Sequence, residues 1–452
     1  MKPFTVLDAL NAVQGTFYGD SEALKREIAF VTSDSRTADA GALFVAIPGS
    51  RVDGHSFMAE CLRKGAVCCL SQRVPEAQEQ PCIVVDNTLR AIGALAAWHR
   101  SRFDIPVVGV TGSVGKTTTK EMIAAVLSAQ FCTHKTEKNF NNELGVPWTL
   151  LKLDEAHEAS VVEMGISDFG EMRRLTHMVR PNIAVMTVIG DAHLEFLGNR
   201  GGVLRAKGEI FEGMQKNDLA ILNGDDALLW TYDPGVPRLT YGLDPKNDFW
   251  AEQIEAQAEN YTRCQIHHGE SAFDAEIPAF GIPAVYAALA ATAVGVALHM
   301  SDERIAEGLS AFQTVGDRAR RIQGKRCAII SDCYNANPNS MQAALRSLSL
   351  LPRRRVAILG DMLELGKQSA QMHRAVGAQA QTEQIDLVIA CGALAQEIYE
   401  GARKNGANAL WYADKSSLIA QLPKLIQEGD HVLVKASHSM AFEEIVHILE
   451  TL

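Results

Sequence analysis

Five short apolar runs in the last third of the chain constrain its fold more than any other feature. The runs are CAIISDCYN, RVAILGDM, DLVIACG, NALWYAD and HVLVKAS, and helical stretches of workable length follow four of them. Strands buried on both faces are apolar throughout, and parallel strands need a crossover, usually a helix, between them. The pattern therefore predicts a doubly wound, Rossmann-like α/β domain over residues 316–452, with ligands at the carboxyl ends of its strands. No glycine-rich dinucleotide motif follows its first strand, so NAD is not indicated.

The middle of the chain shows a similar alternation. The runs IPVVGV, ASVVEMG, NIAVMTVIG and LAILNGDD alternate with helical stretches, which predicts a central α/β domain with a mostly parallel sheet over residues 101–315. Residues 1–100 mix short apolar runs such as ALFVAIPG with helical stretches. They predict a smaller N-terminal α/β domain. A length of 452 residues suits three domains of this kind.

The composition argues against several classes of protein. Hydrophobic residues make up 47% of the chain and charged residues 21%, and no stretch has the roughly 18 uninterrupted apolar residues of a membrane span. The start, MKPFTVLDALNAVQG, lacks the apolar centre of a signal peptide. The net charge of −11 disfavours nucleic-acid binding, and the nine cysteines lack metal-binding or redox spacing. We expect a cytoplasmic protein with reduced thiols and no stable membrane association.

The stretch VTGSVGKTTTK, residues 110–120, indicates a bound nucleoside triphosphate. In such a loop glycines let backbone N–H groups close around phosphate oxygens, Lys116 supplies a positive charge, and the Thr117 hydroxyl holds magnesium. The spacing departs from the usual motif, because Val110 replaces the first glycine and Gly112 supplies the flexibility instead. A glycine turn without a ligand is disfavoured by the strand before it and the helix after it. The predicted nucleotide contacts in this loop are Thr111, Gly112, Ser113, Gly115, Lys116, Thr117 and Thr118.

Three further polar residues stand near the ends of predicted elements in the middle region. Glu163 ends the apolar run SVVEMG, where a charge is costly unless it is paired or bound to a metal. It is a candidate magnesium ligand, and a salt bridge at the rim of the sheet is the alternative. His193, in GDAHLEF, is a similar candidate, although a lone histidine is more often structural. Taken by itself, Lys207 in LRAKGEIF indicates only a solvated helical lysine.

Several segments together resemble one family. These are TGSVGKTTTK, KNFNNELGVPWTLL, EMGISDFGEM, GDAHLEFLGNRGGVLRAKGEIF, SDCYNANPNSM and LGDMLELG. They are similar to the Mur ligases, and YNANPNSM and GDMLELG point to the MurF type. The resemblance implies an ATP-dependent ligase of peptidoglycan precursor assembly, with UDP-MurNAc-tripeptide and D-alanyl-D-alanine as substrates. The tripeptide carboxylate would attack the γ-phosphate, and the amine of the dipeptide would then displace phosphate from the resulting acyl phosphate.

The resemblance also implies roles for the residues of the middle region. Lys116 and Thr117 would contact the γ-phosphate and a first magnesium ion, and Glu163 and His193 would hold a second one. Lys207 stands where the family has a lysine that CO2 converts to a carbamate, which helps to hold that metal. Only an unprotonated amine reacts with CO2, so this site should lower the pKa of Lys207. Arg318, at the junction with the last domain, would reach the γ-phosphate and couple domain closure to chemistry.

Substrate contacts follow from the same resemblance. The first domain would hold the UDP-sugar, the central domain ATP, and the last domain the incoming dipeptide, in a monomer. Asp332 would bind the ribose of ATP. The residues that would face the UDP-sugar, the tripeptide or the dipeptide are Ser35 and Arg36 beside Asp34, Gly49, Asp53 and His55 beside Gly54, Asn139 and Asn142 beside Asn141, and Tyr334, Asn335 and Asn337. For the three asparagines of the middle domain, a loop held by side-chain-to-backbone hydrogen bonds is the alternative.

The chain also departs from the family. Pro283, Ala284 and Ala287 stand where polar residues usually contact adenine, so base recognition must use other groups or be looser. Ala436 and His438 replace a common glycine and arginine, and Cys333 replaces a serine.

Four other classes of protein share some of these features, but each is disfavoured by the sequence. The first is a MurE-type sibling ligase, but the Asn-Pro-Arg signature of that type is absent. A folylpolyglutamate-synthase-like ligase is disfavoured by GDMLELG. A phosphate-loop switch or kinase would not need Glu163, His193 and Lys207. An inactive paralogue is disfavoured because the phosphate and metal residues are intact.

Overall fold

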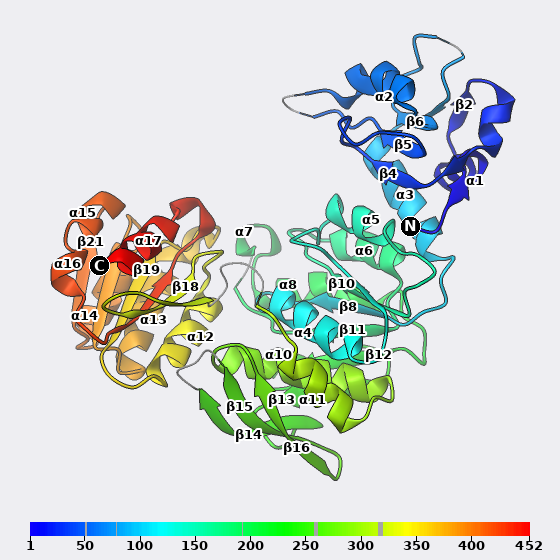
Figure 1. Ribbon diagram of the computed structural model, residues 1–452. Coiled ribbons are helices and arrows are strands. Elements are labelled where there is room, and N and C mark those ends of the chain that lie inside the picture. Colours follow the sequence, from blue (N-terminus) through cyan, green and yellow to red (C-terminus); the bar gives the residue numbers. More distant parts are fainter. Residues whose placement is uncertain (50–51, 78, 192, 257–260, 315–319) are drawn as a thin grey trace.

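The computed structural model describes residues 1–49, 52–77, 79–191, 193–256, 261–314 and 320–452. Figure 1 shows three bodies in chain order, each built around its own sheet. We call them the N-terminal, central and C-terminal parts. Together they confirm the predicted α/β class, with three large sheets in succession that are each mostly parallel. No helix within the described ranges is both long and apolar enough to cross a membrane.

The N-terminal part contains a five-stranded sheet in the order β2-β7-β6-β5-β4. Strands β4 to β7 run parallel, and β2 is antiparallel to β7. The side chain of Asn87 caps the start of helix α3 (Thr88–Arg100). This helix packs on α5 (Gly145–Leu150) and α6 (Glu171–Val179) of the central part. The other elements here are β1 (Phe4–Thr5), α1 (Val6–Val13), β2 (Thr16–Tyr18), β3 (Glu27–Ile28), β4 (Phe30–Thr32), β5 (Ala42–Val45), α2 (Met58–Lys64), β6 (Cys68–Ser71) and β7 (Cys82–Val84).

The central part is built on a nine-stranded sheet in the order β16-β15-β14-β13-β12-β11-β8-β10-β9. Strands β8 to β14 are parallel, and β15 and β16 extend the sheet antiparallel at one edge. The strands are β8 (Val107–Thr111), β9 (Thr133–Lys135), β10 (Ala159–Glu163), β11 (Ile183–Met186), β12 (Leu219–Asn223), β13 (Arg238–Gly242), β14 (Phe249–Ala256), β15 (Thr262–His268) and β16 (Ser271–Ile277).

Helices cover both faces of the central sheet. The helix α4 (Lys116–Ser128) packs with α10 (Ile282–Ala297) and α11 (Asp302–Ser310) on one face. On the other face lie α5, α6 and α8 (Arg200–Gly208). Two short helices, α7 (Leu194–Leu197) and α9 (Ala227–Trp230), lie in the connections. Because both faces are covered, every residue of β8 is buried, and the loop at its carboxyl end is held on a rigid base.

The C-terminal part has a six-stranded sheet in the order β17-β18-β22-β19-β20-β21. All neighbours are parallel except β17 (Arg320–Gln323), a polar edge strand that no apolar run could predict. The other strands are β18 (Ala328–Asp332), β19 (Arg355–Gly360), β20 (Leu387–Cys391), β21 (Ala409–Tyr412) and β22 (His431–Lys435). One face carries α12 (Pro338–Ser349), α13 (Ser369–Thr382) and α14 (Gln396–Lys404), and the other α15 (Lys415–Ile419), α16 (Leu422–Leu425) and α17 (Glu443–Thr451).

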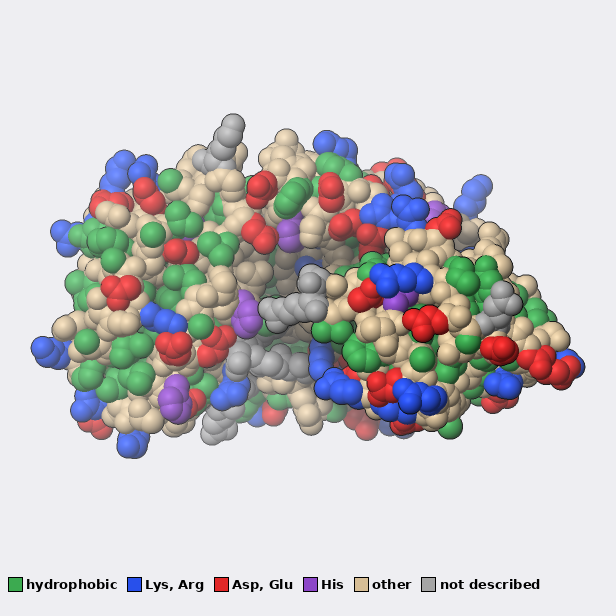
Figure 2. All heavy atoms as spheres, turned by 90° about the horizontal axis from the view of Figure 1, so that it is seen from above, with side chains coloured by type: hydrophobic (Ala, Val, Ile, Leu, Met, Phe, Trp, Pro, Cys, Tyr) green, Lys and Arg blue, Asp and Glu red, His purple; other side chains and the backbone are tan. Residues whose placement is uncertain are grey.

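The C-terminal part lies beside the central part, on the side away from the N-terminal part (Figure 1). Seen from above, the surface is hollowed between the C-terminal part at the left and the rest of the molecule (Figure 2). Residues 190 and 191 of the central part meet Asn339 at the start of α12, because the Asp191 N–H donates to Asn339 Oδ1 at 3.1 Å. This hydrogen bond joins the central part to the start of α12 in the C-terminal part.

Candidate functional site

A cleft of about 380 Å³ lies between the central and C-terminal parts. Residues of the loop after β8 and of the start of α4 form one wall, and residues at the ends of β18 and β22 and along α12 form the opposite one. The residues predicted from the sequence that line it are Ser113, Gly115, Lys116, Thr117, Thr118, Asn139, Glu163, Asp332, Tyr334, Asn335 and Asn337. The cleft therefore joins candidates that are far apart in the chain.

The loop between β8 and α4 has the backbone geometry of a phosphate cradle. Gly112 and Gly115 have φ of +142° and +85°, which favour glycine, and a Cβ at Gly112 would lie 1.9 Å from Thr187 Oγ1. Helix α4 begins at Lys116, so its unsatisfied N–H groups and the positive end of its dipole face the loop. Lys116 Nζ donates to the Gly112 carbonyl at 2.9 Å and stays folded over the loop. These features suit a bound polyphosphate.

Glu163 is a buried carboxylate at the carboxyl end of β10, beside β8 in the sheet. Thr117 Oγ1 donates to Glu163 Oε2 at 2.8 Å, and Asn141 Nδ2 donates to Oε1 at 2.8 Å. The hydrogen bonds that hold the carboxylate therefore come from neutral side chains. The contact with Thr117, which the sequence did not predict, places a hydroxyl and a carboxylate, both oxygen ligands of the kind magnesium prefers, side by side at the end of the phosphate loop.

Lys207 lies in α8 with only 1% of its surface exposed, far from the solvated position that its sequence context alone would indicate. Within the described part of the chain, its amine forms no hydrogen bond or ion pair, and burial and the positive charge of Lys116 hold the pKa of Lys207 well below its usual range. This environment favours the neutral amine, which is the form that reacts with CO2.

His193 precedes α7 in the left-handed backbone conformation. Burial, and then the charges of Lys207 and Lys116, lower the pKa of its imidazole. His193, Lys207 and Lys116 therefore share one electrostatic neighbourhood. Across the gap, His193 Nδ1 lies 3.4 Å from Glu364 Oε2 of the C-terminal part.

The residues present fit a magnesium ion only in part. In the described ranges no three His, Cys, Asp or Glu side chains gather as a ready metal site. Thr117 and Glu163 offer two hard oxygen ligands, and an octahedral ion commonly takes its other ligands from phosphates and water. A carboxylated Lys207 would add a further oxygen ligand near His193.

Lys435 is a contact that the sequence interpretation missed. Its Nζ donates to Asp332 Oδ2 at 2.5 Å and to the Asn335 carbonyl at 2.9 Å, with only 2% of the side chain exposed. It fixes the carboxylate of Asp332 at the end of β18 and the loop that follows. The available signal was a single lysine at the end of the otherwise apolar run HVLVK.

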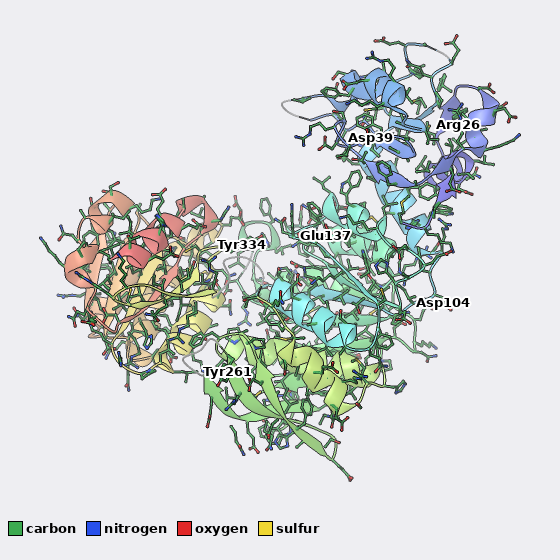
Figure 3. All side chains as sticks on the ribbon, in the orientation of Figure 1. Arg26, Asp39, Asp104, Glu137, Tyr261 and Tyr334 are labelled. Atoms are coloured by element: carbon green, nitrogen blue, oxygen red, sulfur yellow. The ribbon has the colours of Figure 1, made fainter. Side chains whose placement is uncertain are left out.

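The loop after β18 brings Tyr334, Asn335 and Asn337 to the cleft, but two of the three are engaged locally. Asn337 caps α12, since its Oδ1 accepts from the Ser340 N–H at 2.9 Å. Asn335 Oδ1 accepts from the Ala336 N–H at 2.8 Å. Tyr334 lies at the edge that faces the central part (Figure 3). Arg318, the predicted γ-phosphate contact, lies outside the described residues.

The three asparagines of the middle region lie in different settings. Asn142 Oδ1 accepts from the N–H groups of Leu144 and Gly145, so it holds the start of α5 rather than facing the cleft. Asn139 lines the cleft, and Asn141 both lines it and bonds Glu163. Asn142 therefore fits the alternative of a loop held by side-chain-to-backbone hydrogen bonds. Asn141, in contrast, contacts the carboxylate of Glu163 directly.

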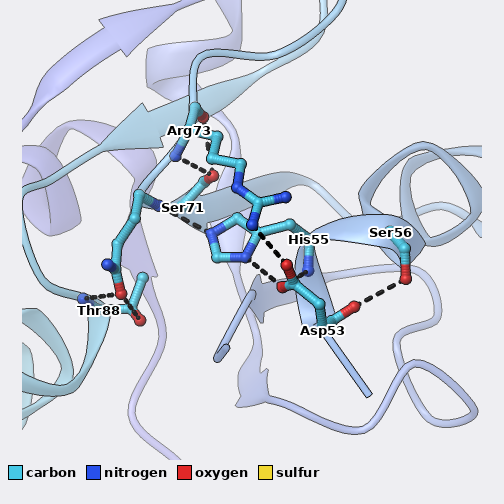
Figure 4. A network of polar contacts seen from close by, with 7 residues as sticks. Asp53, His55, Ser56, Ser71, Arg73 and Thr88 are labelled. Atoms are coloured by element: carbon cyan, nitrogen blue, oxygen red, sulfur yellow. Dashed lines mark hydrogen bonds and ion pairs between the residues drawn. The ribbon is translucent and has the colours of Figure 1, made fainter. Parts of the chain in front are cut away.

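The predicted UDP-sugar residues lie in the N-terminal part, away from the cleft (Figure 1). His55 Nδ1 donates to Asp53 Oδ1 at 2.6 Å, because its Nε2 accepts from the Gln72 N–H at 3.1 Å, and Arg73 binds the other oxygen of Asp53 (Figure 4). Both ring nitrogens are occupied, so His55 orders Asp53 in the loop after β5. Gly49 bonds Val52 through its N–H in the same loop.

Near Ser35, the exposed Arg36 pairs with Asp34 through two nitrogens, and this pairing holds the pKa of Asp34 down at about 2.

The structure also locates the residues that differ from those usual in the family that the sequence resembles. Pro283 and Ala284, at the start of α10, line the cleft, whereas Ala287 is buried in the core of the central part. Cys333 is buried and donates to the Val434 carbonyl. Ala436 is buried as well, and His438 is exposed, with its ring 6.1 Å from that of Tyr334.

Comparison with known families and structures gives a consistent result. The model of the Mur ligase family catalytic domain matches residues 27–100, that of the Mur ligase middle domain residues 110–295, and that of the Mur ligase glutamate ligase domain residues 317–438. A relative from Bacillus subtilis (strain 168), named UDP-N-acetylmuramoyl-tripeptide–D-alanyl-D-alanine ligase, is 37% identical over 449 residues, which cover 98% of this chain and 97% of the relative.

Two solved structures extend this similarity to three dimensions. MurF from Acinetobacter baumannii superposes with a TM-score of 0.91 at 32% identity, covering 100% of this chain and 99% of that one. MurF ligase from Thermotoga maritima, solved in complex with ADP, superposes with a TM-score of 0.84 at 28% identity, covering 94% and 97%. The chain therefore belongs to the Mur ligase family, and within it to the MurF type.

Proposed function

We propose that the chain joins D-alanyl-D-alanine to UDP-MurNAc-tripeptide at the expense of ATP, giving the UDP-MurNAc-pentapeptide of peptidoglycan synthesis. The observation that carries the proposal is the meeting of the phosphate loop and buried Glu163 on one side of a cleft with Asp332 on the other. The buried amine of Lys207 lies close enough to that loop for the charge of Lys116 to lower its pKa. The relatives' names and the ADP bound to the Thermotoga maritima enzyme support the substrates.

The chemistry explains why the parts are needed. A carboxylate is a poor electrophile, so one of its oxygens first attacks the γ-phosphorus and releases ADP. The amine of the dipeptide then attacks the carbonyl carbon of the acyl phosphate, and phosphate leaves with the oxygen that came from the carboxylate. Both reactants of the first step are anionic, and Lys116 with the N-terminus of α4 would offset that repulsion.

We assign the supporting roles as follows. Thr117 would hold a first magnesium ion and Glu163 a second, and these ions when bound neutralise charge on the phosphates and the carboxylate. Lys207 would take up CO2, because a neutral amine and CO2 give a carbamate and one proton, and the resulting anion would act with Glu163 and His193 as ligands of the second ion. Asp332, held by Lys435, would bind the ribose of ATP.

The three parts would divide the substrates. Residues 1–100 would hold the UDP-sugar near Asp53 and Arg36, residues 101–315 ATP, and residues 316–452 the dipeptide. The boundaries of the three family-model matches support this division. We further propose that the protein acts as a monomer in the cytoplasm.

The test is phosphate release from Mg-ATP with UDP-MurNAc-tripeptide and D-alanyl-D-alanine, each omitted in turn, together with mass spectrometry of the product. We expect release to need both acceptors and to match the pentapeptide formed. Release that is indifferent to both would contradict the proposal and indicate a nucleotide switch. Release with a free amino acid in place of the dipeptide would indicate a sibling ligase.

A further inference from the structure

We propose that the part of the cleft that receives the nucleotide base discriminates weakly among bases, so that the chain accepts nucleoside triphosphates other than ATP. The inference rests on the proposed function only in taking the cleft to bind a nucleoside triphosphate. It concerns the end of the cleft between the start of α10 and the middle of α12, which we call the base end.

The two ends of the cleft differ in chemistry. The phosphate loop, Glu163, Asp332 and Lys435 make one end charged and rich in hydrogen-bond donors. The base end is lined by apolar side chains, namely Ala279, Phe280, Pro283, Ala284, Ala343 and Ala344. With the phosphates on the loop and the ribose at Asp332, the apolar end is where the flat base would be buried.

The polar side chains at the base end, among the described lining residues, are hydroxyls. Ser347 donates to the Ala343 carbonyl at 2.9 Å, so its oxygen can only accept from a ligand. Thr314 is exposed and can rotate its hydroxyl. Asn339 and Gln342 of α12 are not among the residues that line the cleft. Asn337, which does line it, is committed to the cap, six residues before Ala343 and thus about 9 Å along the axis.

The backbone around the start of α10 offers few free donors. The Ala279 N–H bonds the Ile277 carbonyl, the Gly281 N–H bonds Thr262 Oγ1, and the Ala284 N–H bonds the Gly281 carbonyl. Pro283 has no N–H. Three backbone N–H groups at the start of α10 are thus committed within the protein and a fourth is missing, which leaves few donors there to match N1 of adenine and reject the N–H of guanine.

This chemistry sets the expected selectivity. Stacking and apolar contact tolerate any base, because every base has a π-face. The Thr314 hydroxyl can donate or accept and so adapts to either pattern, whereas that of Ser347 can only accept. Sites built to hydrogen-bond a particular group reject analogues by roughly 10⁴ or more, whereas apolar pockets discriminate by roughly 10–200-fold. Because stacking itself tolerates every base, we expect the low end of that range, with affinities for different bases within about tenfold of one another.

Equilibrium binding tests this without relying on turnover. ADP, GDP, CDP and UDP, each with magnesium, are competed against a fluorescent ADP analogue on the full-length chain. We expect all four dissociation constants to lie within about tenfold. A preference for ADP above tenfold would overturn the inference.

Ligation with ATP, GTP, CTP and UTP separates this inference from the proposed function. If only ATP supports pentapeptide formation and GDP binds weakly, the function stands and the inference fails. If all four nucleotides bind alike but none supports ligation, the inference stands and the function fails.

A substitution at the base end tests whether its apolar lining sets the selectivity among bases. Ala343→Asn introduces an amide at a half-buried position of the base end, and we expect it to change the ratio of the ADP and GDP affinities by roughly tenfold. Ala375→Asn, at an exposed position of helix α13, is the matched control and should leave the ratio unchanged. An unchanged ratio in folded Ala343→Asn protein would also overturn the inference.

Discussion

We expect Lys207→Ala to lower kcat for pentapeptide formation by roughly 10²–10³-fold, which corresponds to the several kcal/mol that a metal site supplies to a transition state. The reason is the environment of the amine. Its burial and the nearby Lys116 charge lower its pKa and favour the neutral form, which can react with CO2 to give the anion that the metal site lacks. Lys207→Arg should lose as much activity, because a guanidinium stays charged and forms no carbamate.

The matched control is Lys216→Ala, which removes an exposed lysine of the same part and should retain full activity. A second readout is the ¹³C NMR signal of a carbamate in protein incubated with ¹³C-bicarbonate, present in the native chain and absent in Lys207→Arg. Full activity of a folded Lys207→Ala protein, or an unchanged carbamate signal in Lys207→Arg, would contradict the assignment.

Glu163→Gln is expected to have a comparable effect, a loss of roughly 10²–10³-fold in kcat/KM with a higher magnesium requirement. The substitution keeps the size of the side chain but removes the negative charge that faces Thr117 at the end of the phosphate loop. A magnesium titration of phosphate release measures the shift, and Mn²⁺ binding followed by electron paramagnetic resonance reports on the metal without turnover.

The control for this variant is Glu137→Gln, because Glu137 is an exposed carboxylate paired with Lys152 and surface pairs contribute little. The melting temperature of both variants should remain close to that of the native chain. If Glu163→Gln bound Mn²⁺ and turned over like the native protein, Glu163 would be only a hydrogen-bond acceptor for Thr117 and Asn141.

Residues that follow a buried strand directly could be placed from the sequence. The carboxyl ends of parallel neighbours meet at one edge, so the phosphate loop after β8 and Glu163 at the end of β10 were predictable neighbours. Asp332, at the end of β18, could be placed by the same argument within its own sheet. The alternation of apolar runs and helical stretches in the sequence is thus enough to predict the fold and this part of the site.

Contacts decided by loop direction or by distant segments could not be predicted. Asn141 and Asn142 are adjacent, yet one bonds Glu163 and the other holds the turn that leads into α5, because the local backbone turns their side chains apart. Lys435 meets Asp332 across 103 residues of chain, which no local pattern records. The burial of Lys207 could not be predicted either, since it depends on the packing of α8 and not on the neighbours of Lys207 in the sequence.

The most direct test of the account follows one oxygen atom. UDP-MurNAc-tripeptide labelled with ¹⁸O in both oxygens of its terminal carboxylate is incubated with the chain, Mg-ATP and D-alanyl-D-alanine, and the phosphate is analysed by mass spectrometry. Activation through an acyl phosphate predicts one ¹⁸O in each phosphate released and one in the new amide carbonyl. Phosphate without ¹⁸O would contradict the account, because the terminal phosphoryl group would then have been transferred to water and never to the carboxylate.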